Sequence, residues 1–122
     1  MLKVLIIDDS AVMRKIIQRN IQQSGLLVDE FVEAGNSREG LEKAIINNID
    51  LIPCDWNMPK MTGYMTVVDF VKALSGLDIP IVMVINKGSE AEVKNSGADG
   101  YLTKPFTHDQ LRLKLGSFLK VE

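Results

Sequence analysis

Three aspartates and one lysine stand out because their residue types suit a common chemistry. Asp8 and Asp9 follow one apolar run, Asp55 follows a second, and Lys104 stands before Pro105 after a third. Three carboxylates brought together would repel one another strongly unless a cation lay among them. Oxygen ligands without histidine or cysteine favour magnesium or a similar hard ion. A carboxylate beside a metal and a lysine is suited to phosphoryl transfer, because the two cations stabilise negative phosphoryl oxygens.

These four side chains need a scaffold that gathers them, and the hydrophobic pattern predicts one. Short apolar runs alternate along the chain with amphipathic segments. Five runs are expected to form strands: 2–7, 28–32, 49–54, 79–85 and 100–102. The first and the fourth are almost wholly apolar, as expected for strands of a parallel sheet that is covered on both faces.

Five helices are expected after these strands. Their signals are, in order, a stripe from Val12 to Ile21 stopped by Ser24-Gly25, a cap at Asn36, a stripe from Met65 to Leu74, a start at Ser89, and a capping box from Thr107 to Gln110. Alternating strands and helices imply right-handed crossovers. They predict an α/β fold with a doubly wound, five-stranded parallel sheet and five helices.

The carboxyl ends of the strands are where such a sheet places its functional crevice. The three aspartates and the lysine each follow an expected strand, so they should meet at this edge. A single aspartate there is more often a turn or capping residue, and Asp9 or Ser10 would serve as a helix cap. The occurrence of all four residues together, each at a strand end, favours a functional site.

Size and composition narrow the functional classes. The 122 residues fit one compact domain spanning 1–122, and a net charge of −2 predicts no nucleic-acid partner. The longest apolar stretches are strand-length and the apolar start is too short for a signal peptide, so no membrane partner is expected. The single cysteine, Cys54, excludes a disulfide framework and favours a reducing, cytoplasmic setting.

Three segments resemble the response-regulator receiver family. They are VLIIDDSAVMR at 4–14, DWNMPKMTG at 55–63 and GYLTKPF at 100–106. They stand in the family's order and at nearly its spacing, and the resemblance covers essentially the whole chain. In style the sequence is most similar to single-domain, chemotaxis CheY-like regulators. The implied fold is flavodoxin-like, with strand order 2-1-3-4-5.

The resemblance also implies roles for individual residues. Asp55 would be the phosphoacceptor, receiving its phosphoryl group from the phosphohistidine of a histidine kinase. Magnesium would be bound directly by Asp9, through water by Asp8, by Asp55 itself and by the backbone carbonyl of Asn57.

Two further residues acquire roles in the same way. Lys104 would pair with the phosphoryl oxygens and precede a cis peptide bond at Pro105. Tyr101 matches the family's switch aromatic, which changes orientation on activation.

Three features depart from the family pattern. Ile85 ends the fourth expected strand, where the family has Ser or Thr; it offers no hydroxyl to the phosphoryl group, which places coupling to Tyr101 in question. Pro53 lies inside the third expected strand, which must lose a hydrogen bond or deform. The segment 85–104 is shorter than usual by about three residues, roughly one helical turn, which predicts a short fourth helix and an altered partner surface.

The leading hypothesis is therefore a phosphorylatable receiver that acts by binding an unidentified partner protein, as a monomer or weak dimer. Because the chain ends with the fifth expected helix, its output should be intermolecular. It is not expected to be an enzyme beyond catalysing its own aspartyl phosphorylation and dephosphorylation. The alternative is a degenerate receiver acting as a phosphorylation-independent interaction module. Ile85 and the short fourth helix favour it, whereas the intact Asp8, Asp9, Asp55 and Lys104 oppose it.

An enzyme of a different class is disfavoured by the first strand end. A magnesium-dependent phosphatase of the haloacid-dehalogenase type would carry Asp-x-Asp, whereas this chain has Asp8-Asp9-Ser10. A flavin carrier would have a Ser/Thr/Gly-rich phosphate loop there, which the sequence lacks.

Overall fold

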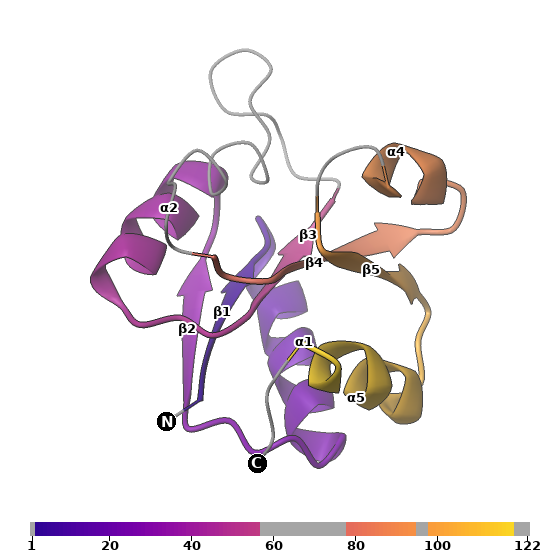
Figure 1. Cartoon of the computed structure of the whole chain (residues 1–122), viewed down its shortest axis with the longest axis horizontal. Helices are drawn as coiled ribbons and strands as arrows, with labels where there is room; N and C mark the ends of the chain where they lie inside the picture. The colour runs from indigo at the N-terminus through magenta and orange to yellow at the C-terminus, as the bar shows by residue number, and fades with distance from the viewer. Residues whose placement is uncertain (1, 57–77, 95–97, 119–122) are drawn as a thin grey trace.

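A five-stranded parallel sheet with helices on both faces forms the fold (Figure 1). The computed structural model describes residues 2–56, 78–94 and 98–118. Its elements are β1 (Lys3–Ile7), α1 (Ala11–Gln23), β2 (Glu30–Ala34), α2 (Ser37–Ile46), β3 (Ile52–Asp55), β4 (Ile81–Asn86), α4 (Glu90–Lys94), β5 (Gly100–Lys104) and α5 (His108–Gly116). The strand order β2-β1-β3-β4-β5 confirms the doubly wound fold.

Helices predicted from the sequence are found wherever the structure describes the chain. Four of the five are present in the described ranges, and the helix expected from Met65 to Leu74 lies outside them. The α4 helix is described over Glu90–Lys94, and residues 95–97, on which the predicted length of this helix depends, lie outside the described ranges. None of the helices in the described ranges is long and apolar enough to cross a membrane.

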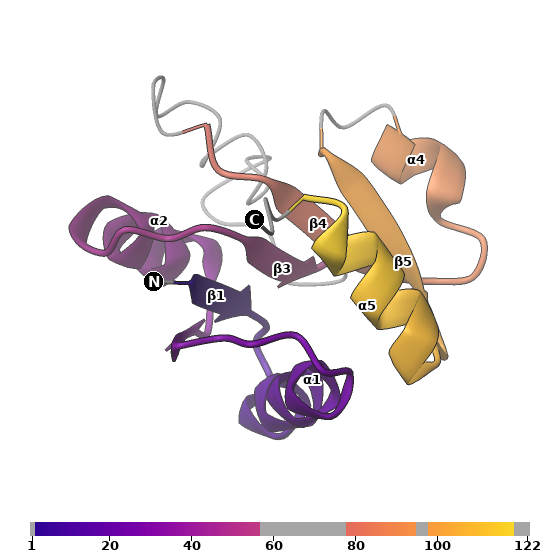
Figure 2. The ribbon, with the colours of Figure 1, turned by 60° about the horizontal axis from the view of Figure 1, so that its bottom comes forward.

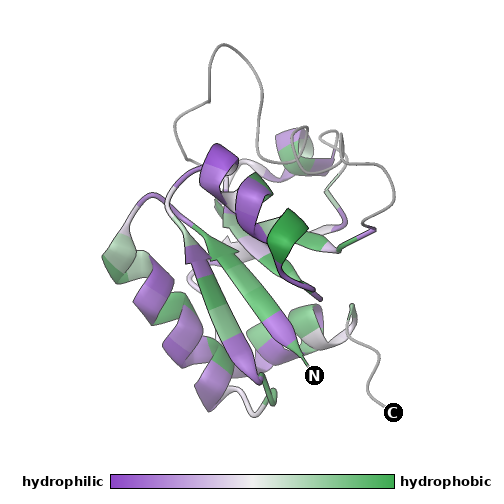
Figure 3. Ribbon diagram, turned by 90° about the vertical axis from the view of Figure 1, so that its left-hand side faces the viewer, coloured by the Kyte–Doolittle hydropathy of each residue, from purple (hydrophilic) through white to green (hydrophobic). Residues whose placement is uncertain are grey.

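Two hydrophobic layers sandwich the sheet, and strand alternation assigns residues to each. In β1, Leu5 and Ile7 face the layer that α2 and α4 cover, whereas Val4 and Ile6 face the layer under α1 and α5. Figure 2 shows the two helix pairs on opposite faces of the sheet. The inner strands β1, β3 and β4 are buried along nearly their whole length, whereas the edge strands β2 and β5 are only partly buried. The helices alternate between hydrophilic and hydrophobic residues (Figure 3).

Capping side chains fix where the helices begin and thus where the strand-end loops finish. The Ser10 hydroxyl accepts from the Met13 N–H at 3.2 Å to start α1. The Asn36 side chain caps α2, as predicted. Thr107 and Gln110 form the predicted capping box at α5, bonding to each other's backbone N–H groups at 3.1 and 2.9 Å.

All five strand boundaries differ from prediction by one to three residues. The expected runs 2–7, 28–32, 49–54, 79–85 and 100–102 correspond to strands at Lys3–Ile7, Glu30–Ala34, Ile52–Asp55, Ile81–Asn86 and Gly100–Lys104. β2 begins at Glu30 rather than at residue 28, because pairing with β1 starts at Lys3 opposite Glu30. Just before that pair, the Asp29 N–H donates a hydrogen bond to the Leu2 carbonyl at 2.8 Å. β5 runs on to Lys104, since Asn86 at the end of β4 still pairs with it.

Pro53 interrupts the pairing of β3 with β1. Leu51 accepts a hydrogen bond from the Leu5 N–H of β1 at 3.0 Å, and residues two apart on a strand face the same neighbour. Residue 53 therefore also faces β1, but proline has no N–H to offer the Leu5 carbonyl. In the described part of the chain, β1 and β3 pair only at Ile7–Cys54 and at the isolated bridge Val4–Leu51. The predicted loss of a ladder hydrogen bond is confirmed.

Candidate functional site

The three aspartates meet at the carboxyl edge of the sheet. Asp8 directly follows β1 and Asp55 ends β3, and these strands are neighbours through the Ile7–Cys54 pair. One carboxylate oxygen from each of Asp8, Asp9 and Asp55 lies within 4.8 Å of the others. Asp8 and Asp55 are buried and Asp9 is exposed, so the cluster opens to solvent at Asp9. The tertiary structure thus brings together the acids that the sequence singled out.

Lys104 completes the cluster from the end of β5. Its Nζ lies 3.9 Å from Oδ1 of Asp55, and its side chain is 26% exposed. The peptide bond between Lys104 and Pro105 is cis, as the resemblance to the receiver family implied. An ammonium therefore stands at the same edge as the acids, where it can face both Asp55 and an incoming anion.

The two carboxylate oxygens of Asp8 differ in their hydrogen bonding. Its Oδ1 accepts from the Ser10 N–H at 2.9 Å, whereas its buried Oδ2 has no hydrogen-bond partner in the described structure. Burial raises the pKa of Asp8, and the negative charge of Asp55 raises that pKa further, although the Ser10 N–H lowers it. A buried carboxylate oxygen without a partner is costly unless a cation or a donor reaches it.

The donor set fits magnesium. The carboxylates supply hard oxygen ligands, and the exposed side of the cluster leaves room for the water molecules that magnesium keeps. Cys54 lies beneath the acids, but it is fully buried and burial raises the pKa of its thiol well above the usual value. The thiol therefore stays protonated and does not compete with the carboxylate oxygens as a metal ligand. Asn57, expected to add a backbone carbonyl, lies outside the described residues.

The two switch candidates contact the same hydrophobic layer. Ile85 is 0% exposed and belongs to the layer under α2 and α4, and the partly buried ring of Tyr101 packs against that layer. The ring also has the ammonium groups of Lys94 and Lys114 at 5.9 and 5.7 Å from its centroid. The position of Ile85 is thus filled by a purely apolar side chain.

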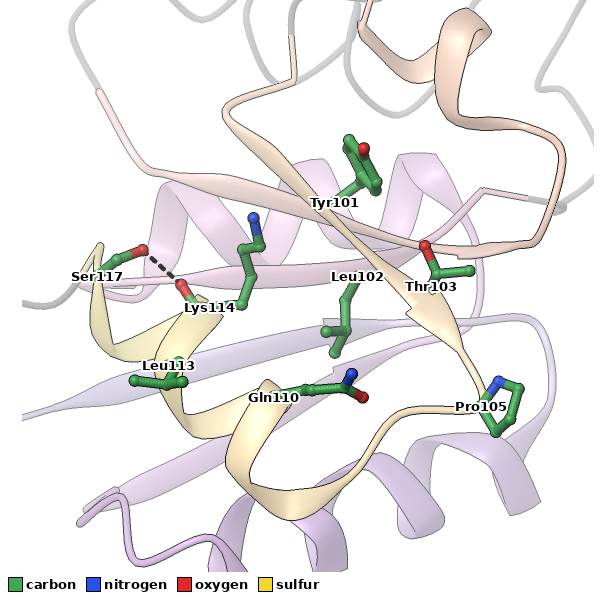
Figure 4. Close-up of a pocket in the computed structure, with 8 residues that line it drawn as sticks. All are labelled: Tyr101, Leu102, Thr103, Pro105, Gln110, Leu113, Lys114 and Ser117. Carbon is green, nitrogen blue, oxygen red and sulfur yellow. Dashed lines mark hydrogen bonds between the residues drawn. The ribbon is translucent and has the colours of Figure 1, made fainter.

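A groove of about 610 Å³ lies between β5 and α5. Tyr101 and Leu102 line it from the strand, and Leu113 and Lys114 line it from the helix (Figure 4). The Ser117 hydroxyl donates to the Lys114 carbonyl at 2.7 Å and closes the last turn of the helix there. None of the three aspartates lines the groove, so it is separate from the acidic cluster.

Two residues near the site had no role assigned from the sequence. Arg14 donates to the backbone carbonyl of Asp8, and its guanidinium is held by Glu33 of β2. The sequence signal was Arg14 itself, six positions after Asp8 in the first motif. Its acceptors could not be identified before β2 was placed beside β1.

Comparisons with known proteins agree with this geometry. Residues 4–116 match the family described as Response regulator receiver domain. The chain is 36% identical over 119 residues to chemotaxis protein CheY1 of Helicobacter pylori, covering 93% of this chain and 94% of that protein. It is 34% identical over 122 residues to the CheY homolog of Campylobacter jejuni, covering 97% and 92% of the two chains. The solved structure of CheY4 from Vibrio cholerae matches with a TM-score of 0.75 and 35% identity, over 98% of this chain and 99% of that one.

Proposed function

Because this chain belongs to the response regulator receiver family, we propose that it carries a phosphoryl group on Asp55 in a two-component relay. The chain is a receiver domain of the CheY type, and its cluster of Asp8, Asp9 and Asp55 supports a phosphoacceptor role. The observation that carries the proposal is Asp55 at a strand end, with two further carboxylates and the Lys104 ammonium around it.

Asp8, Asp9 and Asp55 would hold a magnesium ion, together with the Asn57 backbone carbonyl. Bound there, magnesium supplies positive charge that offsets the carboxylates and the phosphoryl oxygens. The Oδ2 atom of Asp8, which has no hydrogen-bond partner, supports this assignment, because it could serve as a ligand of an ion held among the three acids.

The transfer step uses the chain's own side chains. A carboxylate oxygen of Asp55 attacks the phosphorus of a phosphohistidine on the kinase. As the new P–O bond forms, the P–N bond breaks, and the imidazole nitrogen keeps its electron pair and takes up a proton. Lys104 binds a phosphoryl oxygen and stabilises its negative charge. Hydrolysis by water then returns Asp55 to a carboxylate and releases inorganic phosphate.

The output would be the binding of a partner protein on the face formed by α4, β5 and α5. Tyr101, flanked by Lys94 and Lys114, lies on this face and lines the groove between β5 and α5. Relatives that are named chemotaxis proteins support a role in chemotaxis. We propose that the protein acts in the cytoplasm and that it is a monomer or a weak dimer.

A second candidate function rests on Ile85. Because this buried side chain offers no hydroxyl to a phosphoryl group, phosphorylation lacks one bond through which it could reposition Tyr101. The chain would then be a phosphorylation-independent interaction module that keeps the receiver fold. The acidic cluster and Lys104 favour the first candidate function, in which Asp55 is phosphorylated.

Acetyl phosphate with magnesium tests the acceptor chemistry directly. Intact mass spectrometry should show the gain of one phosphoryl group, which is lost in Asp55→Asn and on chelation of magnesium. An unchanged mass in the wild type would refute the phosphoacceptor role. Fluorescence of Trp56, which follows Asp55 in the chain, separates the two candidates. A response to beryllofluoride and magnesium supports switching, whereas phosphorylation without any response favours the interaction module.

A further inference from the structure

A network of charged side chains surrounds the loop that carries Asp8 and Asp9. Arg14 of α1 donates from Nη1 to the Asp8 carbonyl at 2.5 Å and from Nε to Oε1 of Glu33 at 3.0 Å. Lys15 binds the other oxygen of the same carboxylate at 2.7 Å. The Arg14 side chain is only 17% exposed, so this fork is largely shielded from water.

The acceptor on Asp8 gives the network its significance. The Asp8 carbonyl belongs to the peptide unit that joins Asp8 to Asp9, so a bond to it fixes the plane of that peptide. The Asp8 N–H is held at the same time by the Ala34 carbonyl at 3.1 Å. The Ser10 N–H holds Oδ1 of Asp8 at 2.9 Å. With these atoms occupied, Oδ2 of Asp8 remains for the acidic cluster.

Glu33 supplies the orientation that Arg14 needs. The guanidinium is a planar fork, so pairing one edge with Glu33 fixes the direction in which Nη1 points. Lys43 of α2 in turn donates to the Glu33 carbonyl, which ties β2 to the helix beside it. The support therefore runs from α2 and β2 through Arg14 to the peptide between Asp8 and Asp9.

We propose that Arg14, oriented by Glu33, is a positioning residue for the cation site, holding the Asp8–Asp9 peptide so that both carboxylates face the ion. The inference rests on the proposed magnesium site. Groups that orient metal ligands typically affect affinity by about 10–100-fold. Arg14 also carries a positive charge, which by itself opposes cation binding. Positioning and simple electrostatics thus predict opposite signs when the residue is removed.

Magnesium titrations of Arg14→Met and Lys15→Met test the inference. The two substitutions remove the same charge from the same carboxylate partner, but only Arg14 reaches Asp8. The magnesium dissociation constant, followed by Trp56 fluorescence and by calorimetry, should rise about tenfold in Arg14→Met. Because an exposed lysine contributes little, Lys15→Met should stay within about twofold of the wild type. Hydrogen exchange of the Ser10 amide, measured without metal, should be faster only in the Arg14 variant.

Arg14→Lys provides a second variant that keeps the charge. A single ammonium cannot reproduce the planar fork that serves Asp8 and Glu33, so magnesium should again bind more weakly. Wild-type affinity in a folded Arg14→Met or Arg14→Lys protein would overturn the positioning role and leave the magnesium site intact. A wild type that fails to bind magnesium would instead overturn the proposed site, and the inference with it.

Discussion

The Nζ of Lys104 lies 3.9 Å from Oδ1 of Asp55, at the end of a strand that is not a sheet neighbour of β3. This separation is at the outer limit of an ion pair and longer than a direct hydrogen bond. The ammonium therefore stands beside the carboxylate without covering it. In the proposed function, this ammonium would be available to an incoming phosphoryl oxygen.

Replacing Lys104 by methionine should slow phosphorylation of Asp55 far more than it changes the fold. Loss of one donor to developing oxyanion charge typically lowers a rate by about 10²–10³-fold. The rate of phosphoryl gain from acetyl phosphate, followed by intact mass, measures the effect. Lys114→Met is a suitable control, because it removes a lysine from the Tyr101 face instead. Equal rates in the two variants would remove Lys104 from the chemistry.

Asp8 should make stability depend on pH in protein freed of divalent cations. Its pKa is raised in the folded state, first by burial, so the ionised carboxylate destabilises the fold. The penalty is absent below the unfolded pKa near 3.8 and complete above the raised folded pKa. Asp8→Asn should therefore be more stable than wild type at pH 7, and the difference should vanish at about pH 3.5.

Urea unfolding at several pH values, in the presence of a chelator, measures this difference in the free energy of unfolding. Added magnesium should then stabilise the wild type more than Asp8→Asn, since a ligand that binds only the folded state adds to stability. A difference that persists unchanged at low pH would contradict the assigned cause.

Ile85→Thr should introduce a hydroxyl at the residue before the last of β4. A hydrogen bond to a charged phosphoryl group contributes about 1.5–3 kcal/mol, so the phosphorylated state should be stabilised. Ring NMR signals of Tyr101 should then respond more strongly to beryllofluoride and magnesium. Ile85→Val is the control, because valine has nearly the shape of threonine but no hydroxyl, and it loses the same part of the isoleucine side chain. If Thr and Val behave alike, the hydroxyl does not govern the switch.

Pro53→Val should stabilise the protein. A backbone N–H at residue 53 faces the Leu5 carbonyl, and a buried carbonyl without a donor costs about 1–3 kcal/mol. Loss of the proline's restriction on the unfolded chain offsets about 0.4–1 kcal/mol of that gain. The free energy of unfolding should rise by about 1 kcal/mol on balance. Pro80→Ala, just before β4, removes a proline without filling the gap opposite Leu5 and should not show this gain.

Much of the fold followed from the sequence because its patterns are local. Apolar runs covered on both faces, alternating with amphipathic helices, are enough to predict a doubly wound parallel sheet. The caps at Asn36 and Thr107 were recognisable because each needs only its own residue and the next turn. Strand ends were less certain, since β2 begins where its neighbour β1 allows pairing, which no local pattern records.

The sequence by itself also singled out the residues of the acidic cluster and the lysine beside it. Asp8, Asp9, Asp55 and Lys104 were identified by residue type at strand ends, and a parallel sheet leaves those ends on one edge. The effect of Pro53 was likewise predictable, because a missing N–H is a property of the residue.

Only the tertiary structure decided how these groups are held. It brought β1 beside β3, buried Oδ2 of Asp8 and left that atom without a partner. It also placed Glu33 of β2 where it orients Arg14 toward the Asp8 carbonyl. The physical reason is that burial and hydrogen-bond partners depend on segments distant in sequence, so they exist only once the sheet has assembled.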